Sequence, residues 1–317
     1  MRQLYLKTLV FALFAMMGLQ TFAYDVEIDG IYYDLNETQK TATVTYDVKF
    51  NSSYSGVINI PAEIVCDGVT YSVRNIGYYA LTGCHITHVS IPNSVVYIGQ
   101  SAFEYCEDLT DIVIPNSVTY IDKQAFRKCR GLNNVTLGNS LKTIERKAFY
   151  KCTALTSIII PNSVEDIYES AFEGCTALTS IVLPNKNTYN PYIGTEAFAN
   201  CTNLRSVISP LDSPSFLFAD VFTCTEGVDN SSIVYETATL YVPLGKKAVY
   251  EETDGWKLFR NIVETDIEKL SGIADVVSDQ SVQKTYYSLS GRCLQQMQKG
   301  LNIIRMADGR VMKVLKP

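Results

Sequence analysis

Apolar and polar residues recur with a period of about 23 residues through the middle of the chain. One copy, at 109–115, reads LTDIVIP, and close copies return at 155–161 and 178–184. Alternation of this kind predicts a short strand in which Ile112 and Ile114 face inward and Val113 faces outward. Proline lacks the N–H that a further ladder bond needs, so it ends the strand, and the Asn-Ser that follows in most copies is typical of a turn.

A second recurring element is the motif Ala-Phe-x-x-Cys, complete in the central copies and weaker at both ends. Successive cysteines lie 22, 23, 23, 23, 26 and 23 residues apart. These cysteines are Cys84, Cys106, Cys129, Cys152, Cys175, Cys201 and Cys224. A fixed period in this range is the signature of a solenoid, whose coils bury their apolar sides only by stacking on one another. The sequence therefore predicts a β-rich solenoid with about 23 residues per coil.

The shared position of these seven cysteines predicts a column of thiols about 4.7–4.9 Å apart, the spacing of neighbouring strands. Buried thiols behave as small hydrophobic groups, so we interpret the column as reduced and structural. One or two disulfides are the alternative, because exported proteins commonly carry them. Cys66 and Cys293 fall outside the column.

The first 23 residues have the pattern of an export signal. Arg2 and Lys7 precede an apolar stretch, 9–19, that is too short to span a bilayer, and small residues lie before Tyr24. We expect cleavage near Ala23. No later segment is apolar over the ~20 residues of a membrane helix, so no membrane-spanning segment is expected in the mature chain.

Four further segments follow the signal. Residues 24–75 alternate as strands and are predicted to form an N-terminal β cap, and 76–264 form the solenoid with its closing cap, which includes a helix over 248–259. Residues 265–282 are polar and predict a linker. Residues 283–317 predict a small C-terminal β module, with a hairpin turn at Asp308-Gly309.

Composition and motifs argue against catalysis and nucleic-acid binding. The net charge is -6, whereas a general nucleic-acid binder carries an excess of Lys and Arg. The only histidines, His85 and His88, are three residues apart, so on a regular strand they face opposite sides and form no metal pair. The chain contains no GxSxG, HExxH or phosphate-binding loop. We expect no enzyme activity, metal or cofactor.

The repeat LxxIxIPNSVxxIxxxAFxxC resembles the BspA-type leucine-rich repeats of exported bacterial and protist surface proteins. The resemblance covers about residues 60–265, and 240–264 is similar to the way such proteins of Bacteroidales close their arrays. It implies a curved leucine-rich-repeat solenoid that binds partners at the cell surface. Departures are Leu137-Gly138 in place of Ile-Pro, an insertion near 187–191 and an irregular last coil.

The segment 286–316 is similar to small C-terminal β modules of exported Bacteroidales proteins. That resemblance implies a sorting or surface-attachment signal. A β cap without a targeting role is the alternative.

Two surfaces are candidates for binding. The outward strand face carries Thr110, Asp111, Asn134 and Ser157 with their neighbours in each coil, and Val182 is predicted to lie on it as well. A basic cluster over 123–151 has eight cations and one acid, Glu145. Its candidate binding residues are Arg127, Lys128, Arg146, Lys147 and Lys151, with Tyr120 and Tyr150 as stacking surface alongside Tyr97 and Tyr105. Either surface is alternatively a solvated face without a partner.

The resemblance and the absence of a catalytic motif lead to one expectation for function. The chain is expected to be an exported cell-surface or secreted binding protein whose partner is a host or microbial surface protein or an acidic glycan. A spacer that self-associates without a ligand is the alternative from another class. An accessory role in carbohydrate binding is the third hypothesis.

Overall fold

The computed structural model describes residues 24–47, 54–185, 190–224, 233–267, 285–287, 293–294, 300–305 and 311–316. The chain divides into two compact units, Met1–Ile267 and Glu268–Pro317. The predicted export signal and almost all of the predicted linker lie outside the described residues.

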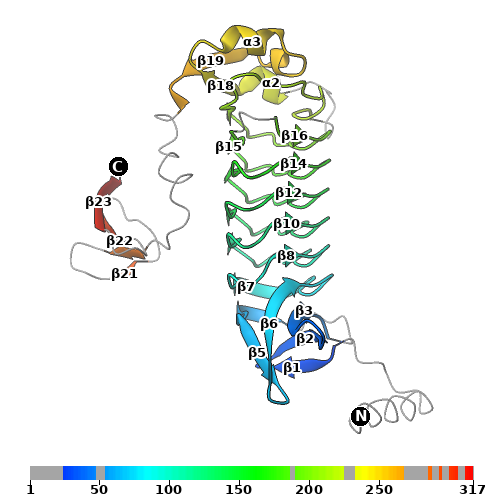
Figure 1. Cartoon of the computed structure of the whole chain (residues 1–317). Coiled ribbons are helices and arrows are strands. Elements are labelled where there is room, and N and C mark those ends of the chain that lie inside the picture. The colour runs from blue at the N-terminus through cyan, green and yellow to red at the C-terminus, as the bar shows by residue number, and fades with distance from the viewer. Residues whose placement is uncertain are drawn as a thin grey trace. The chain divides into compact units, whose positions relative to one another are not determined.

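The first unit is a stack of coils with two ladders of parallel strands (Figure 1). One ladder consists of the short strands β8 (Tyr97–Ile98), β10 (Tyr120–Ile121), β12 (Thr143–Ile144), β14 (Asp166–Ile167) and β16 (Tyr192–Ile193). The strands β7 (His85–Ser90), β9 (Asp111–Val113), β11 (Asn134–Thr136), β13 (Ser157–Ile159), β15 (Ser180–Val182) and β17 (Ser206–Ile208) follow one another along a second side of the stack. Here the parallel pairing is interrupted: β9 pairs with β11, and β13, β15 and β17 pair in series. The predicted β-rich solenoid is therefore confirmed.

The core runs along the stack as columns of identical residues. Six phenylalanines from Phe103 to Phe222 are buried, and their rings stack on one another with centroids 4.9–5.5 Å apart. Ile112 and Ile114 are buried as predicted, while Val113 is 59% exposed. Stacking places each apolar column against copies of itself, which is why no single coil is stable alone.

The turn that carries Ala-Phe-x-x-Cys bends through two left-handed residues in every coil from Tyr79 to Asn200. Gln124 and Lys128 have φ of 60° and 59°, and the equivalent residues of neighbouring coils have similar values. Left-handed backbone is unfavourable for residues other than glycine. Here it directs the N–H of Lys128 to the carbonyl of Tyr150 in the next coil, so coil-to-coil hydrogen bonds offset the strain.

Gly138 shows why one coil lacks the usual proline. A Cβ atom at this position would lie 2.3 Å from the carbonyl oxygen of Pro115 in the preceding coil. Such a contact is far below van der Waals distance, so the backbones approach more closely here than any other residue permits.

The N-terminal end of the stack is closed by strands. Antiparallel β1 (Val26–Ile28), β2 (Ile31–Asn36) and β3 (Thr41–Thr45) lead to β6 (Val69–Ile76), which pairs in parallel with both β3 and β8. Two further strands join at the sides, β5 (Glu63–Cys66) beside β6 and β4 (Ser55–Asn59) beside β7. The cap therefore continues the short-strand ladder and covers the apolar end of the first coil.

The C-terminal end is closed by β18 (Thr239–Pro243), β19 (Asn261–Thr265) and short helices (Figure 1). A further helix, α2 (Ile233–Thr237), precedes β18. The single helix predicted over 248–259 is wrong. The chain forms α3 (Lys247–Glu252) and a 3₁₀ turn, η1 (Trp256–Leu258), because Thr253 is extended and Gly255 has φ of +84°.

In the second unit, four strands form one antiparallel sheet in the order β21-β20-β22-β23. They are β20 (Thr285–Tyr287), β21 (Cys293–Leu294), β22 (Gly300–Arg305) and β23 (Val311–Lys316). β22 and β23 pair as a hairpin, with Arg305 opposite Val311. The predicted turn residues Asp308 and Gly309 lie outside the described residues.

Candidate functional site

Five side chains of neighbouring turns form the strongest candidate site, which we call the lysine–tyrosine cluster: Tyr105, Lys128, Lys147, Tyr150 and Lys151. Stacking brings them together, since Tyr105, Lys128 and Lys151 occupy the same position in three successive coils. These three residues and Lys147 have left-handed backbone, and their side chains are partly or fully exposed. The site is therefore a direct product of the repeat.

Each lysine of the cluster lies over a tyrosine ring. The Nζ of Lys128 is 4.8 Å from the ring centroid of Tyr105, and the Nζ atoms of Lys147 and Lys151 are 5.2 and 5.4 Å from that of Tyr150. Such cation–π contacts hold the ammonium groups in place, and they leave further donors of Lys128 and Lys147 unused. Lys128 also donates a 3.0 Å hydrogen bond to the Tyr105 hydroxyl, and this bond lowers the pKa of Tyr105.

Arg127 lies beside the cluster and has a structural role. Its guanidinium donates to the carboxylate of Glu104, whose side chain is only 8% exposed. It also lies 5.5 and 5.7 Å from the ring centroids of Tyr105 and Tyr150. The ion pair neutralises a nearly buried carboxylate, so the guanidinium of Arg127 is not available to a partner. Its contacts with both rings position Tyr105 and Tyr150.

Three other cations of the predicted basic cluster also meet carboxylates of adjacent coils. Arg146 bonds Glu169 at 2.8 Å and Lys142 bonds Glu165 at 2.9 Å. The third pair joins Arg130 to Glu107 at 3.6 Å. The predicted local excess of positive charge is therefore too high, because acids one coil away fall outside the counted segment 123–151. Among the described residues, Lys128 and Lys147 have no carboxylate within ion-pair distance.

Tyr120 does not join the lysine–tyrosine cluster. It lies in the short-strand ladder, and its hydroxyl donates a 2.6 Å hydrogen bond to Glu145. Burial raises its pKa, with Glu145 as the second cause. Tyr97, one coil earlier, stacks on Tyr120 with ring centroids 5.9 Å apart. The structure thus separates the four tyrosines into two pairs on different faces.

The strand face carries the remaining candidate residues. Thr110, Asn134 and Ser157 are exposed and Asp111 is half-buried, with Asp111 and Asn134 directly paired across β9 and β11. Val182 was predicted to face outward but is only 9% exposed. Its register partners Ile159 and Ile208 flank it on both sides and cover it. The face is flat and polar, without the aromatic and arginine anchors of binding hot spots.

The two histidines share one face, so the prediction of opposite faces is wrong. β4 and β7 shift register at Thr87, and this bulge turns both His85 and His88 outward. Their Nδ1 atoms lie 2.7 and 2.9 Å from carboxylate oxygens of Asp108 and Asp111 in the next coil. Within the described ranges, no group of three or more His, Cys, Asp or Glu side chains is arranged to hold a metal.

The seven cysteines of the column are all buried free thiols. Five donate hydrogen bonds to the preceding coil, as in Cys129 to the Phe103 carbonyl at 3.0 Å and Cys152 to the Phe126 carbonyl at 3.2 Å. Burial raises the pKa of the thiols, to about 12 for Cys175. Such thiols are poor nucleophiles and poor metal ligands, so the column contributes packing and not chemistry.

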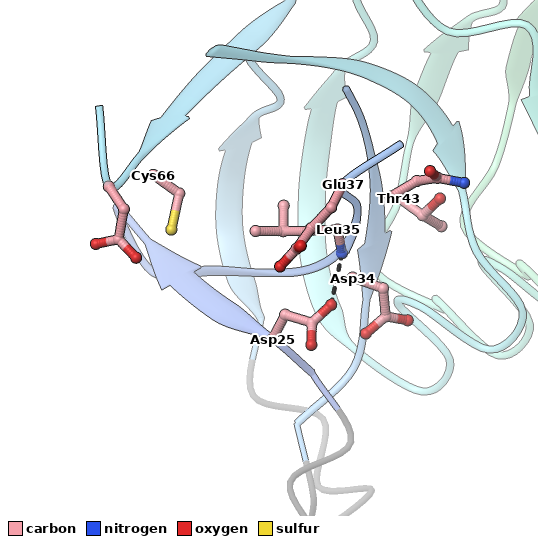
Figure 2. Close-up of a pocket in the computed structure, with 8 residues that line it drawn as sticks. Asp25, Asp34, Leu35, Glu37, Thr43 and Cys66 are labelled. Atoms are coloured by element: carbon pink, nitrogen blue, oxygen red, sulfur yellow. Dashed lines mark hydrogen bonds between the residues drawn. The ribbon is translucent and has the colours of Figure 1, made fainter. Parts of the chain in front are cut away.

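A hollow in the N-terminal cap is lined by acids that sequence reasoning did not single out. Asp25, Asp34, Glu37 and Asp67 line it together with Cys66 (Figure 2). One oxygen of Asp25 accepts the N–H of Leu35 at 2.7 Å. Burial, followed by the charge of Asp25, raises the pKa of Asp34.

No helix among the residues that the structure describes is long and apolar enough to cross a membrane.

Comparisons with known proteins agree with this architecture. The family model for the BspA type leucine rich repeat region matches six copies, over residues 64–126 and 97–223. No curated protein matches the chain. The matched family is a repeat family, and no catalytic family is indicated.

The solved structures that resemble this chain include leucine-rich repeat proteins of bacteria. The match to the Treponema pallidum leucine rich repeat protein has 28% sequence identity and a TM-score of 0.50. It covers 59% of this chain and 85% of the Treponema chain. A leucine-rich repeat protein from Bacteroides capillosus is 29% identical over 46% of this chain and 86% of its own, with a TM-score of 0.31. A leucine rich cell surface protein from Faecalibacterium prausnitzii is 20% identical over 78% and 95%, with a TM-score of 0.32.

Proposed function

The chain belongs to the BspA-type leucine-rich repeat family, and we propose that it is an exported binding protein that recognises an anionic partner through the lysine–tyrosine cluster. The family supports a role in protein interaction or adhesion. The export pattern of the first 23 residues supports a place at the cell surface or outside the cell. The partner class is an acidic segment of a surface protein or an acidic glycan.

The observation that carries this proposal is the arrangement of cations in the cluster. Lys128 and Lys147 are held over tyrosine rings without a carboxylate partner among the described residues, while Arg127, Arg130, Lys142 and Arg146 are paired. An ammonium with unused donors attracts carboxylate or sulfate groups, and the rings add contact area. The charge is local, since the whole chain has a net charge of -6.

The test measures binding of the mature protein to immobilised heparin, hyaluronan and a panel of host matrix proteins, at low and high salt. The variant Lys128→Asn/Lys147→Asn/Lys151→Asn removes three charges. Asparagine tolerates left-handed backbone, and Asn200 already occupies the column of Lys128 and Lys151 with φ of 58°. The control Arg130→Gln/Lys142→Gln/Arg146→Gln removes the same charge from paired cations.

We expect salt-sensitive binding that the lysine variant loses and the control keeps, because exposed charges are screened over roughly 8–10 Å at physiological ionic strength. Equal loss in both variants would mean that only net charge matters and would contradict a local site. Absence of binding to every probe, together with self-association of the unmodified protein, would replace the proposal with the spacer hypothesis.

A further inference from the structure

A second group of aromatic side chains lies on the short-strand ladder, away from the lysine–tyrosine cluster. At its N-terminal end, Tyr97 and Tyr120 are register partners in β8 and β10, and their rings stack with an interplanar angle of 22°. Their hydroxyls donate to Asp122 at 2.5 Å and Glu145 at 2.6 Å, one coil further on. Each ring is thereby fixed beside a carboxylate.

At the C-terminal end of the same ladder, four aromatic rings follow one another. Tyr168 contacts Tyr192 at 5.7 Å between centroids, Tyr192 contacts Phe218 at 6.4 Å, and Phe218 contacts Phe216 at 5.1 Å. Tyr168, Tyr192 and Phe216 are 37%, 43% and 59% exposed. Single exposed apolar residues are ordinary, but a contiguous row of exposed rings marks an interaction surface.

Polar side chains separate the two aromatic groups. The register of β10, β12, β14 and β16 aligns Tyr120, Thr143, Asp166 and Tyr192 in one column. These coils are about 4.8 Å apart, so the two ring groups are separated by roughly the length of a short oligosaccharide. The surface thus alternates ring faces with hydroxyl and carboxylate oxygens.

The carboxylates on this face are held in place with acceptor capacity to spare. Asp122 also accepts the backbone N–H of Lys123 at 2.6 Å, and Glu145 that of Arg146 at 3.1 Å. A carboxylate accepts about four hydrogen bonds, and each of these oxygens uses only part of that capacity. They are suited to neutral donors such as hydroxyl groups, which approach without disturbing the existing bonds.

We propose that this surface, defined by Tyr97, Tyr120, Asp166, Tyr168, Tyr192 and Phe216, binds a neutral glycan chain. Rings offer flat apolar faces to the C–H faces of sugars, and the intervening oxygens accept sugar hydroxyls. An acidic partner or a nucleic acid meets repulsion from Asp122, Glu145 and Asp166. An apolar protein surface would desolvate those carboxylates without compensation.

The inference does not depend on the lysine–tyrosine cluster, and the experiment separates the two sites. Isothermal titration calorimetry measures binding of cello-, xylo-, malto- and manno-hexasaccharides and of a lysine-rich peptide to the mature protein. The variant Tyr168→Ala/Tyr192→Ala/Phe216→Ala removes the exposed rings. The matched control Val57→Ala/Val65→Ala/Val113→Ala removes three exposed apolar side chains elsewhere.

We expect at least one hexasaccharide to bind with little salt dependence, and the ring variant to weaken it about tenfold or more while the control leaves it unchanged. The Lys128→Asn/Lys147→Asn/Lys151→Asn variant should also leave it unchanged. Failure of all hexasaccharides to bind, or binding that survives loss of the rings, overturns the proposal. Salt-sensitive binding of the peptide alone overturns it in favour of a cationic partner.

Discussion

Within each Ala-Phe-x-x-Cys turn, the inward and outward positions follow opposite rules. The inward column repeats phenylalanine and cysteine in coil after coil. The two intervening positions carry unlike residues, Glu104-Tyr105, then Arg127-Lys128, then Tyr150-Lys151, and all of these except the nearly buried Glu104 are partly or fully exposed. Identical residues stack well because each ring or thiol meets its own shape one coil away. Unlike residues on the outside form ion pairs and ring contacts between coils, and these contacts make the candidate binding sites.

The difference teaches where stability and recognition reside in this solenoid. Changes on the inside create cavities that neighbouring coils cannot fill, because both sides are packed. Changes on the outside remove exposed pairs that contribute little to stability but decide which partner fits. Three experiments test this separation.

The largest contrast should be in thiol reactivity. In the native protein, Cys152 and Cys175 are fully buried and their pKa values are raised, whereas Cys66 is partly exposed. At pH 8 the thiolate form of a column cysteine arises only when the coil opens, so its labelling should be at least about a thousandfold slower than that of Cys66. Timed alkylation with peptide mapping by mass spectrometry measures this ratio. Comparable rates would show that the turns open freely.

The next effect concerns the phenylalanine column. Phe149 is buried between Phe126 and Phe172, each 5.1 Å away. Phe149→Ala should lower the free energy of unfolding by about 3–5 kcal/mol, measured by denaturant titration followed by circular dichroism. Phe216→Ala, which removes the same side chain from an exposed position, is the control and should change it by less than about 0.5 kcal/mol. Equal effects would contradict the separation of inside and outside.

The smallest effect distinguishes two kinds of outward cation. Arg127→Ala leaves the nearly buried Glu104 without its partner, and we expect a loss of about 1.5–3 kcal/mol in the same titration. Arg146→Ala breaks the exposed pair with Glu169 and should cost about 0–1 kcal/mol. If the two variants are equally stable, Arg127 is not structural and belongs with the lysine–tyrosine cluster as a binding residue.

Much of the interior could be predicted from the sequence because period and polarity decide it. Ile112 and Ile114 face inward, and the seven cysteines occupy equivalent buried positions. The errors fall where one coil departs from the average. A bulge at Thr87 turned His88 outward, and Gly255 interrupted the closing helix. A single irregular residue changes the direction of a side chain, and the spacing of apolar residues does not predict where such a residue falls.

The candidate sites were less predictable, because their members are distant in sequence. The segment 123–151 contains the cations but not Glu104 and Glu169, the acids that neutralise Arg127 and Arg146. The charge of the segment alone therefore overstates the positive charge of the surface. Tyr120 and Tyr150 are both near basic residues in sequence, yet one lies on the short-strand ladder and the other on the turns. The aromatic row from Tyr168 to Phe216 gave no signal in the sequence, since its residues do not share one repeat position.

The sequence by itself determined the length of the coil, the columns inside it and the membership of a repeat family, because burial demands the same kind of residue every 23 positions. Only the tertiary structure decided which outward residues meet. Stacking brings side chains one coil apart to within about 5 Å of each other. Those contacts depend on the register of whole coils, which no local pattern of residues contains.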